Sequence, residues 1–243
     1  MVADDFIHYR YSFTWPDGRE VGIAIGLHRQ TLDAPAPARA PETAPDWVRL
    51  DTCQCPNCPL SVDTHPLCPV AQRVEPLLTQ FADATSYEAV HVRVDTEQRS
   101  YSADTTLQQG VSSMLGVVMA TSGCPVLDPL RPMARFHLPF ASYEETAYRA
   151  LSMYLLAQHV RAQQGMTPDW PLDGYVAMYQ AIQQVNAAFA RRLRQFITND
   201  ANANALVILD CFAAMTAMDV DMRRSIPASL EAMFSPWLEQ APH

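Results

Sequence analysis

Apolar residues alternate with polar or small residues in two regions of the first half of the chain. Residues 6–29 contain two such runs, separated by Pro16-Asp17-Gly18, a sequence typical of a tight turn. Residues 90–94 alternate in the same way, and residues 99–103 are a suitable hairpin partner. This pattern predicts four strands that form a small antiparallel sheet.

Other regions repeat apolar residues at helical spacing. They are residues 71–81, 107–122, 142–164, 173–197 and 203–218, with a short last helix from Pro227 to about Leu238. Gly123 is expected to end the second of these helices, because helices commonly stop at a glycine. Ser142 and Glu145 have the spacing of a capping box, which predicts the start of the third.

The strands therefore gather in the first half of the chain and the helices in the second. This order predicts an α+β fold with a small antiparallel sheet, a cysteine-rich metal loop and a mostly helical C-terminal half. Residues 1–140 are expected to form the α+β region, and residues 141–243 a helical region packed on it as one unit. The Pro/Ala-rich residues 33–46 are expected to be an extended linker.

The composition limits the cellular setting of the protein. Apolar residues make up 49% of the chain and charged residues 18%, as in globular proteins. No apolar run approaches the roughly 20 residues that cross a bilayer. The first residues are acidic, whereas a secretory signal has a basic start and an apolar run. We therefore expect a soluble cytoplasmic protein without membrane association.

The charge excludes further classes. The net charge is −9, and all 17 basic residues are arginine. The absence of lysine excludes Schiff-base, P-loop and kinase-type chemistry that depends on a lysine. The densest basic cluster is Arg191, Arg192 and Arg194, for which the sequence favours a solvated helix face. Since an acidic chain repels nucleic acid, we expect no nucleic-acid partner.

The cysteines are the strongest chemical signal. Six occur, and four of them precede proline, far more than 19 prolines in 243 residues would give by chance. These four are Cys55, Cys58, Cys68 and Cys124. Proline after a thiolate ligand stiffens the turn that aims later backbone N–H groups at the sulfur atom. Cys55-Pro-Asn-Cys58 also has the spacing of a zinc knuckle.

The preferred ligand set for one tetrahedral site is therefore Cys55, Cys58, Cys68 and Cys124. Two alternatives stay open: Cys53 in place of Cys124, or His65 in place of one thiolate. All-sulfur sites suit zinc or an iron–sulfur cluster, and the knuckle favours zinc. Cys211, inside the apolar helix predicted at 203–218, is interpreted as a buried hydrophobic residue.

Three strings of this sequence carry a resemblance. Cys55-Pro-Asn-Cys58-Pro-Leu60, Ser122-Gly123-Cys124-Pro125 and Met133-Ala-Arg-Phe-His137-Leu-Pro-Phe140 are similar to those of an uncharacterised bacterial family of unknown function. The similarity extends from the first strand into the C-terminal helices. It implies no activity and no site.

Three functional hypotheses follow from the residues. The first is a metal-binding protein whose structural zinc site serves a binding or regulatory role, with an unknown protein partner or self-association. The second is an iron–sulfur redox or sensor protein. The third is a thiol- or metal-dependent enzyme with Cys124 as nucleophile, His137 as base and Glu144 or Glu145 as the orienting residue. For His137 itself, the sequence favours a histidine hydrogen-bonded in the core.

Overall fold

The computed structural model describes residues 5–35, 43–81, 83–196 and 228–238. The contacts of the chain divide it into two compact units. The first unit comprises residues 1–140 and 184–210, and the second comprises residues 141–183 and 211–243. The sheet and the described cysteines all belong to the first unit.

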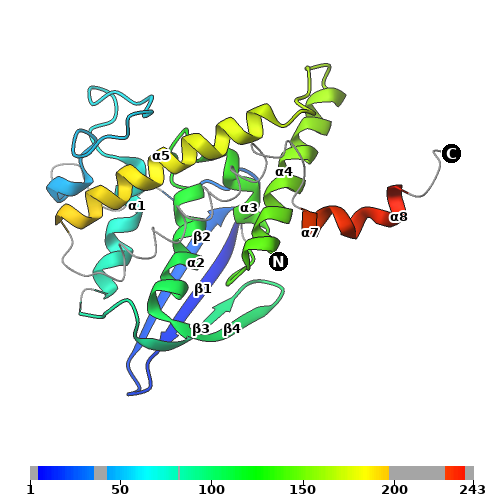
Figure 1. Ribbon diagram of the computed structural model, residues 1–243. Helices are drawn as coiled ribbons and strands as arrows, with labels where there is room; N and C mark the ends of the chain where they lie inside the picture. Colours follow the sequence, from blue (N-terminus) through cyan, green and yellow to red (C-terminus); the bar gives the residue numbers. More distant parts are fainter. Residues whose placement is uncertain (1–4, 36–42, 82, 197–227, 239–243) are drawn as a thin grey trace. The chain divides into compact units, whose positions relative to one another are not determined.

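The first unit is built on a four-stranded antiparallel sheet in the order β2-β1-β3-β4 (Figure 1). Its strands are β1 (Phe6–Thr14), β2 (Glu20–His28), β3 (Ala89–Asp95) and β4 (Ser100–Thr106). β1 is central, and its Tyr11 pairs with Ile23 of β2 and Val94 of β3. The α+β class and the two predicted hairpins are confirmed.

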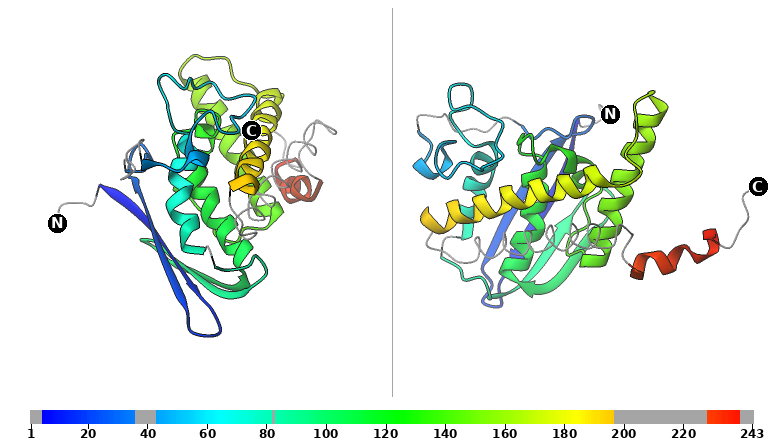
Figure 2. Two further views of the ribbon diagram at one scale, coloured as in Figure 1. Left: turned by 90° about the vertical axis from the view of Figure 1, so that its left-hand side faces the viewer. Right: turned by 45° about the horizontal axis from the view of Figure 1, so that its top comes forward.

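One face of this sheet is buried and forms the core of the unit. Because side chains alternate along a strand, one residue in two contributes to this face. Its fully covered members are Ile7, Tyr9, Tyr11, Phe13, Ile23, Ile25, Leu27, Val90, Val92 and Val94. Two helices, α1 (Pro69–Leu78) and α2 (Leu107–Ala120), pack on each other and cover this face (Figure 2). The result is a two-layer arrangement, with a layer of helices on one face of an antiparallel sheet.

The helix α2 approaches the sheet closely at Gly110. A Cβ atom at this position would lie 2.7 Å from the ring of Phe13 and 2.9 Å from a methyl group of Val92. Only glycine permits this separation of helix and sheet. The helix ends at Ala120, two residues earlier than the sequence predicts, and Gly123 follows with a φ of 87°.

The loop expected after Gly123 contains two short helical elements. They are η4 (Asp128–Leu130) and α3 (Arg131–Arg135), each with a proline in its first turn, where the missing N–H group costs no hydrogen bond. Similar single turns, η2 (Asp46–Val48) and η3 (Thr79–Phe81), flank α1. Proline spacing alone did not indicate these turns.

The second unit begins with α4 (Tyr143–Gln163). Its predicted capping box is present, because the Ser142 amide donates to Glu145 Oε2 at 2.8 Å and the Glu145 amide donates to Ser142 Oγ at 3.2 Å. α5 (Asp173–Phe196) starts in this unit, and its residues from 184 onward belong to the first unit.

Three short C-terminal elements follow the second part of α5 in sequence: α7 (Ala228–Glu231), η5 (Ala232–Phe234) and α8 (Ser235–Leu238). They correspond to the predicted last helix, divided by a 3-10 turn. The predicted helix at 203–218 lies outside the described residues.

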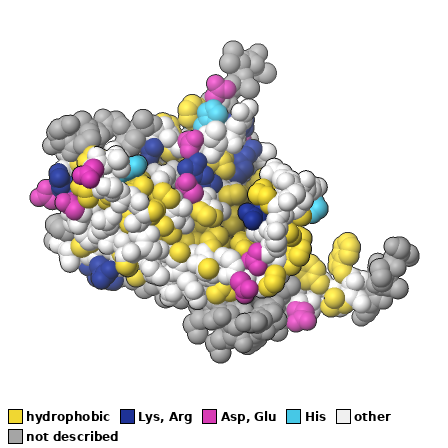
Figure 3. Space-filling view, turned by 90° about the horizontal axis from the view of Figure 1, so that it is seen from above, with side chains coloured by type: hydrophobic (Ala, Val, Ile, Leu, Met, Phe, Trp, Pro, Cys, Tyr) yellow, Lys and Arg dark blue, Asp and Glu magenta, His cyan; other side chains and the backbone are white. Residues whose placement is uncertain are grey.

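Charges of both signs are mixed on the surface. On the face drawn in Figure 3, arginine and acidic side chains lie near one another among apolar ones. Among the helices described, none combines the length and the apolar character needed to span a bilayer.

Candidate metal centre

The cysteine-rich segment is a loop closed at its base. It leaves η2 and returns to α1, and Arg49 and Leu67 form a β-bridge between its two ends. The Leu50 amide donates to the carbonyl of Pro66 at 3.0 Å, and the Cys68 amide donates to that of Val48 at 2.9 Å. The positions of the cysteines are therefore fixed by backbone pairing at the base of the loop.

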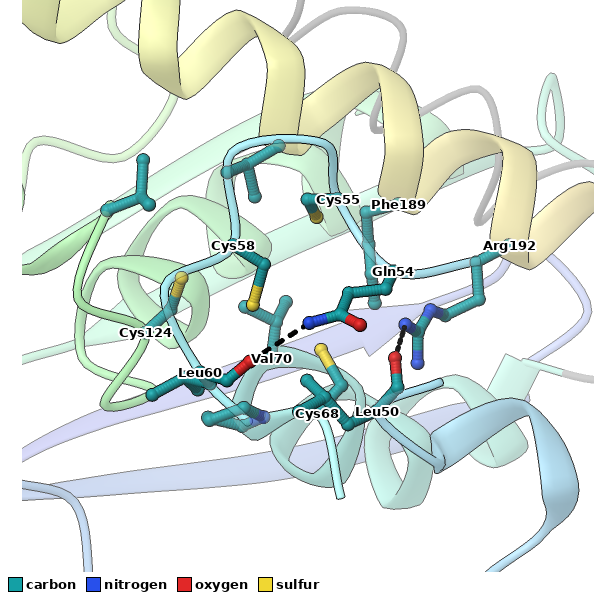
Figure 4. A pocket seen from close by; sticks show the side chains of 13 residues that line it. Leu50, Gln54, Cys55, Cys58, Leu60, Cys68, Val70, Cys124, Phe189 and Arg192 are labelled. Atoms are coloured by element: carbon teal, nitrogen blue, oxygen red, sulfur yellow. Dashed lines mark hydrogen bonds between the residues drawn. The ribbon is translucent and has the colours of Figure 1, made fainter. Parts of the chain in front are cut away.

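Four cysteines from three segments line one small cavity beneath this loop (Figure 4). Cys55 and Cys58 lie on one turn, closed by a 3.0 Å hydrogen bond from the Cys58 amide to the Cys55 carbonyl. Cys68 is the N-cap residue of α1, and Cys124 follows the end of α2. We call this space the thiol cavity, and its four cysteines are those of the ligand set preferred from the sequence.

The thiol cavity is small and mostly apolar. Its volume is about 20 Å³, and a space of roughly 10–15 Å³ is needed for one water molecule. Besides the cysteines, its walls are mainly Leu50, Leu60, Val70, Val126 and Phe189, with Gln54 and Arg192 as polar members.

Burial favours the protonated thiol at Cys55 and Cys124. It raises the pKa of Cys55 to about 12, and the three other cysteines of the cavity add to the rise while Arg192 opposes it. Burial also raises the pKa of Cys124. Backbone hydrogen bonds from Val126 and Leu127 act in the opposite direction on Cys124. Donors two and three residues after the cysteine are the arrangement expected of a Cys-Pro sequence.

Arg192 enters the cavity wall from α5. It is only 1% exposed, and its Nη1 donates to the carbonyls of Trp47 at 2.9 Å and Arg49 at 2.7 Å. Its Nη2 lies 3.4 Å from the carbonyl of Leu50. Within the described parts of the chain it has no carboxylate partner, so its charge is met only by backbone dipoles and the cysteine sulfur atoms.

The expectation of a solvated face is thus wrong for Arg192, although Arg191 and Arg194 are exposed. Sequence reasoning missed Arg192 as a lining residue. A signal was present, because Arg192 is seven residues after Val185 and three after Phe189, on the apolar stripe of the same helix.

The alternative ligands lie outside the thiol cavity. Cys53, with a φ of 49°, directs its Sγ to Gln195 Oε1 at 2.9 Å. His65 is exposed and contacts Thr64 Oγ1 through Nδ1 at 2.9 Å. Cys211 lies outside the described residues. The structure therefore brings together the preferred set and neither alternative.

The proposed nucleophile and base do not share a cavity. His137 is half-buried, its Nε2 is 2.6 Å from the hydroxyl of Tyr11, and it lines a second cavity. Glu145 is occupied as the capping residue of α4, and Glu144 is exposed in its first turn. His91 and His159 are exposed. Nothing in this geometry assembles Cys124 and His137 for catalysis.

The cysteine side chains are near one another but are not positioned as a completed site. Among the residues with described positions, no three His, Cys, Asp or Glu side chains already form a metal-holding group. All five described cysteines are free. Binding one ion would therefore require cysteine side chains to rotate toward the centre of the cavity.

A family model for a domain of unknown function (DUF6901) matches residues 7–235. The chain belongs to the DUF6901 family. The resemblance to a family of unknown function is thereby confirmed. The residues that match the DUF6901 family model include the sheet, the thiol cavity and α5. No curated protein and no solved structure shows significant similarity to the chain.

Proposed function

We propose that this protein binds one zinc ion through the thiolates of Cys55, Cys58, Cys68 and Cys124, and that the ion has a structural role. The observation that carries the proposal is the convergence of these four cysteines, from three segments, on one cavity of about 20 Å³. The ion would join the cysteine loop and the start of α1 to the segment after α2.

The chemistry of the cavity supports a metal over unliganded thiols. Four thiols facing a space of this size gain little from packing, and the raised pKa values of Cys55 and Cys124 make these two cysteines poor nucleophiles. A divalent cation reverses this situation, because it stabilises the thiolate form of each ligand. A metal therefore accounts for both the clustering and the burial of the cysteines.

Size favours zinc over an iron–sulfur cluster, whereas the buried negative charge needs a counter-charge with either group. Four thiolates around Zn²⁺ carry a net charge of −2, which is costly to bury without a counter-charge. Arg192 supplies one positive charge at the cavity wall. A cluster of several iron and sulfide atoms needs more room than a space near the volume of one or two water molecules.

A closed four-thiolate site leaves no coordination position for a substrate, so the role is structural. Such an ion would hold the outer part of the loop, which is largely exposed from residue 61 to 66, in one conformation. We therefore propose a binding or regulatory function for the protein, in which the loop is presented to a protein partner or to a second copy of the chain.

The first test is elemental analysis with a visible spectrum on protein purified without oxygen. We expect about one zinc per chain and no absorption in the visible range. Iron together with acid-labile sulfide would replace this proposal with a redox or sensing function. Protein that is free of metal after purification, and that does not take up added zinc, would overturn the metal site.

Single substitutions then test the ligand set. Cys55→Ser, Cys68→Ser and Cys124→Ser should each lose zinc, because a hydroxyl is a poor replacement for a thiolate ligand. Cys53→Ser is the matched control, since Cys53 belongs to the same loop but faces Gln195. If Cys124→Ser kept full zinc occupancy and Cys53→Ser lost zinc, the fourth ligand would be Cys53 and not Cys124.

A further inference from the structure

A second cavity of about 170 Å³ lies in the first unit, away from the cysteines. Its walls come from the first half of β1, the turn between β3 and β4 with the start of β4, and the segment from the last residue of α3 onward. The turn contributes Glu97 and Arg99, and the segment contributes Arg135, Phe136 and His137. We call this space the arginine cavity.

The charges at the arginine cavity do not balance. Glu97 is paired with Arg29, whose Nη1 is 3.0 Å from Glu97 Oε2. Arg99 and Arg135 have no carboxylate partner among the residues that the structure describes. The hydrogen bonds of Arg99 with Thr96 use its backbone only. Within the part of the chain that the structure describes, neither guanidinium group therefore has a counter-ion.

The wall that carries Arg135 is held rigidly against the sheet. The hydroxyl of Tyr9 donates to the carbonyls of Ala134 at 2.7 Å and Arg135 at 3.0 Å. The ring of His137 packs edge-on against Tyr9, with 5.6 Å between ring centres, and bonds to the hydroxyl of Tyr11. Because this wall is already held in place, little conformational entropy is lost when a ligand binds to it.

An apolar surface adjoins Arg135 at this cavity. The side chain of Phe136 is 75% exposed, and the Arg135 guanidinium lies 5.7 Å from the centre of its ring. Guanidinium groups match carboxylate and phosphate oxygens geometrically. An aromatic face beside them can cover the organic part of the same ligand.

We propose that the arginine cavity binds a small organic anion through a carboxylate or phosphate group held by Arg99 and Arg135. The volume is well above that of one water and below the roughly 300–1,000 Å³ typical of drug-sized ligands, so the ligand is small. This site does not depend on the metal proposal, because the two cavities share no residue.

The test is calorimetric titration of the purified full chain with phenyl phosphate, benzoate and benzamide. We expect one-to-one binding of at least one of the two anions and none of the neutral benzamide. Binding of phenyl phosphate alone would assign a phosphate ligand, and binding of benzoate alone a carboxylate. Either result supports the proposal and names the head group.

Matched variants locate the binding. Arg99→Gln and Arg135→Gln should each weaken the binding of the anion by roughly ten-fold or more. This is the effect expected from the loss of a hydrogen bond to a charged group. Arg191→Gln, exposed on α5 and outside the cavity, removes the same charge and should bind as wild type. Arg99→Gln should also melt as wild type, because among the described residues the side chain of Arg99 makes no hydrogen bond or ion pair that would be lost.

Three results would overturn the proposal. One is the absence of binding by both anions. A second is equal binding of benzamide, which would show that the aromatic ring alone is recognised. The third is wild-type affinity for the anion in both Arg99→Gln and Arg135→Gln. An equal loss of affinity in Arg191→Gln would count in the same way, because it would show that only the net charge of the protein matters.

Discussion

Arg192 Nη1 donates to the carbonyl oxygen of Arg49 at 2.7 Å, inside the first unit. The contact joins the buried face of α5 to the strand-like base of the cysteine loop, 143 residues away in sequence. Arg192 also bonds to the carbonyls of Trp47 and Leu50, so that one side chain holds three carbonyl groups at the base of the loop. The same guanidinium lines the thiol cavity.

Replacing Arg192 should therefore lower both stability and metal affinity. Arg192→Leu leaves buried carbonyls without a donor and removes the positive charge beside the thiolates. We expect the free energy of unfolding to fall by about 2–4 kcal/mol, measured by urea denaturation, with reduced zinc content. Arg194→Gln, exposed on the same helix, is the control and should change neither. An Arg192→Leu protein with wild-type stability and full zinc would contradict the role given to this residue.

Removal of zinc should expose the thiols unequally. With the ion bound, we expect the four cysteines of the thiol cavity to react slowly with iodoacetamide, since their sulfur atoms are coordinated. A chelator should accelerate alkylation at these positions, because without the ion their turns can open to solvent and the burial that raises the pKa values of Cys55 and Cys124 is relieved. The rate at Cys53 should stay unchanged. Peptide mass spectrometry measures each position separately. Equal acceleration at Cys53 would indicate general unfolding of the loop instead of release of its ligands.

Two glycines of α2 give a matched pair. Gly110→Ala places a methyl group against Phe13 and Val92 at distances that neither can accommodate without moving. We expect a loss of about 1–3 kcal/mol in thermal or urea unfolding. Gly116→Ala meets no atom within 4 Å, and alanine should stabilise the helix by about 0.5–1 kcal/mol. Similar effects of the two substitutions would contradict the close approach of α2 to the sheet.

The second unit should lose stability in acid through Asp169. The Tyr154 hydroxyl donates to Asp169 Oδ2 at 2.6 Å and the Gly174 amide at 2.7 Å, and the Tyr154 bond is the main cause that holds the pKa of Asp169 below its ordinary 3.8. A carboxyl group whose pKa is lower in the folded state than in the unfolded state stabilises the fold at pH values above its unfolded-state pKa. That stability is lost as the pH falls from about 4 toward the lower folded-state pKa.

Tyr154→Phe tests this linkage. It should destabilise the protein by about 1 kcal/mol at neutral pH, where Asp169 is ionised, and by less below pH 3.8. Melting temperatures of wild type and variant at pH 7 and pH 3 measure the difference. Tyr148→Phe, at an exposed position on α4, should show no pH-dependent difference. A constant difference between Tyr154→Phe and wild type at both pH values would rule out the role of Asp169 ionisation.

Local sequence signals were sufficient for most of the elements. Alternation at Val90, Val92 and Val94 predicts β3, and helical spacing predicts α1, α2, α4 and α5, because each pattern reflects contacts made within one element. The Ser142–Glu145 pair predicts the start of α4 for the same reason. The short helices at 128–135 were missed, and the contact that holds the end of the second one, from the Tyr9 hydroxyl to the carbonyls of Ala134 and Arg135, comes from a distant part of the chain.

What the sequence alone determined is the α+β class, the order of its elements and the identity of four cysteines with a common chemical signature. These depend on periodicity, turn residues and spacing, which are local properties. Only the tertiary structure decided that Cys124 meets Cys55, Cys58 and Cys68 at one cavity while Cys53 does not. It also decided that Arg192 is buried and that Arg99 and Arg135 share a second cavity. Such placements arise from packing between segments far apart in the chain, and no local pattern encodes them.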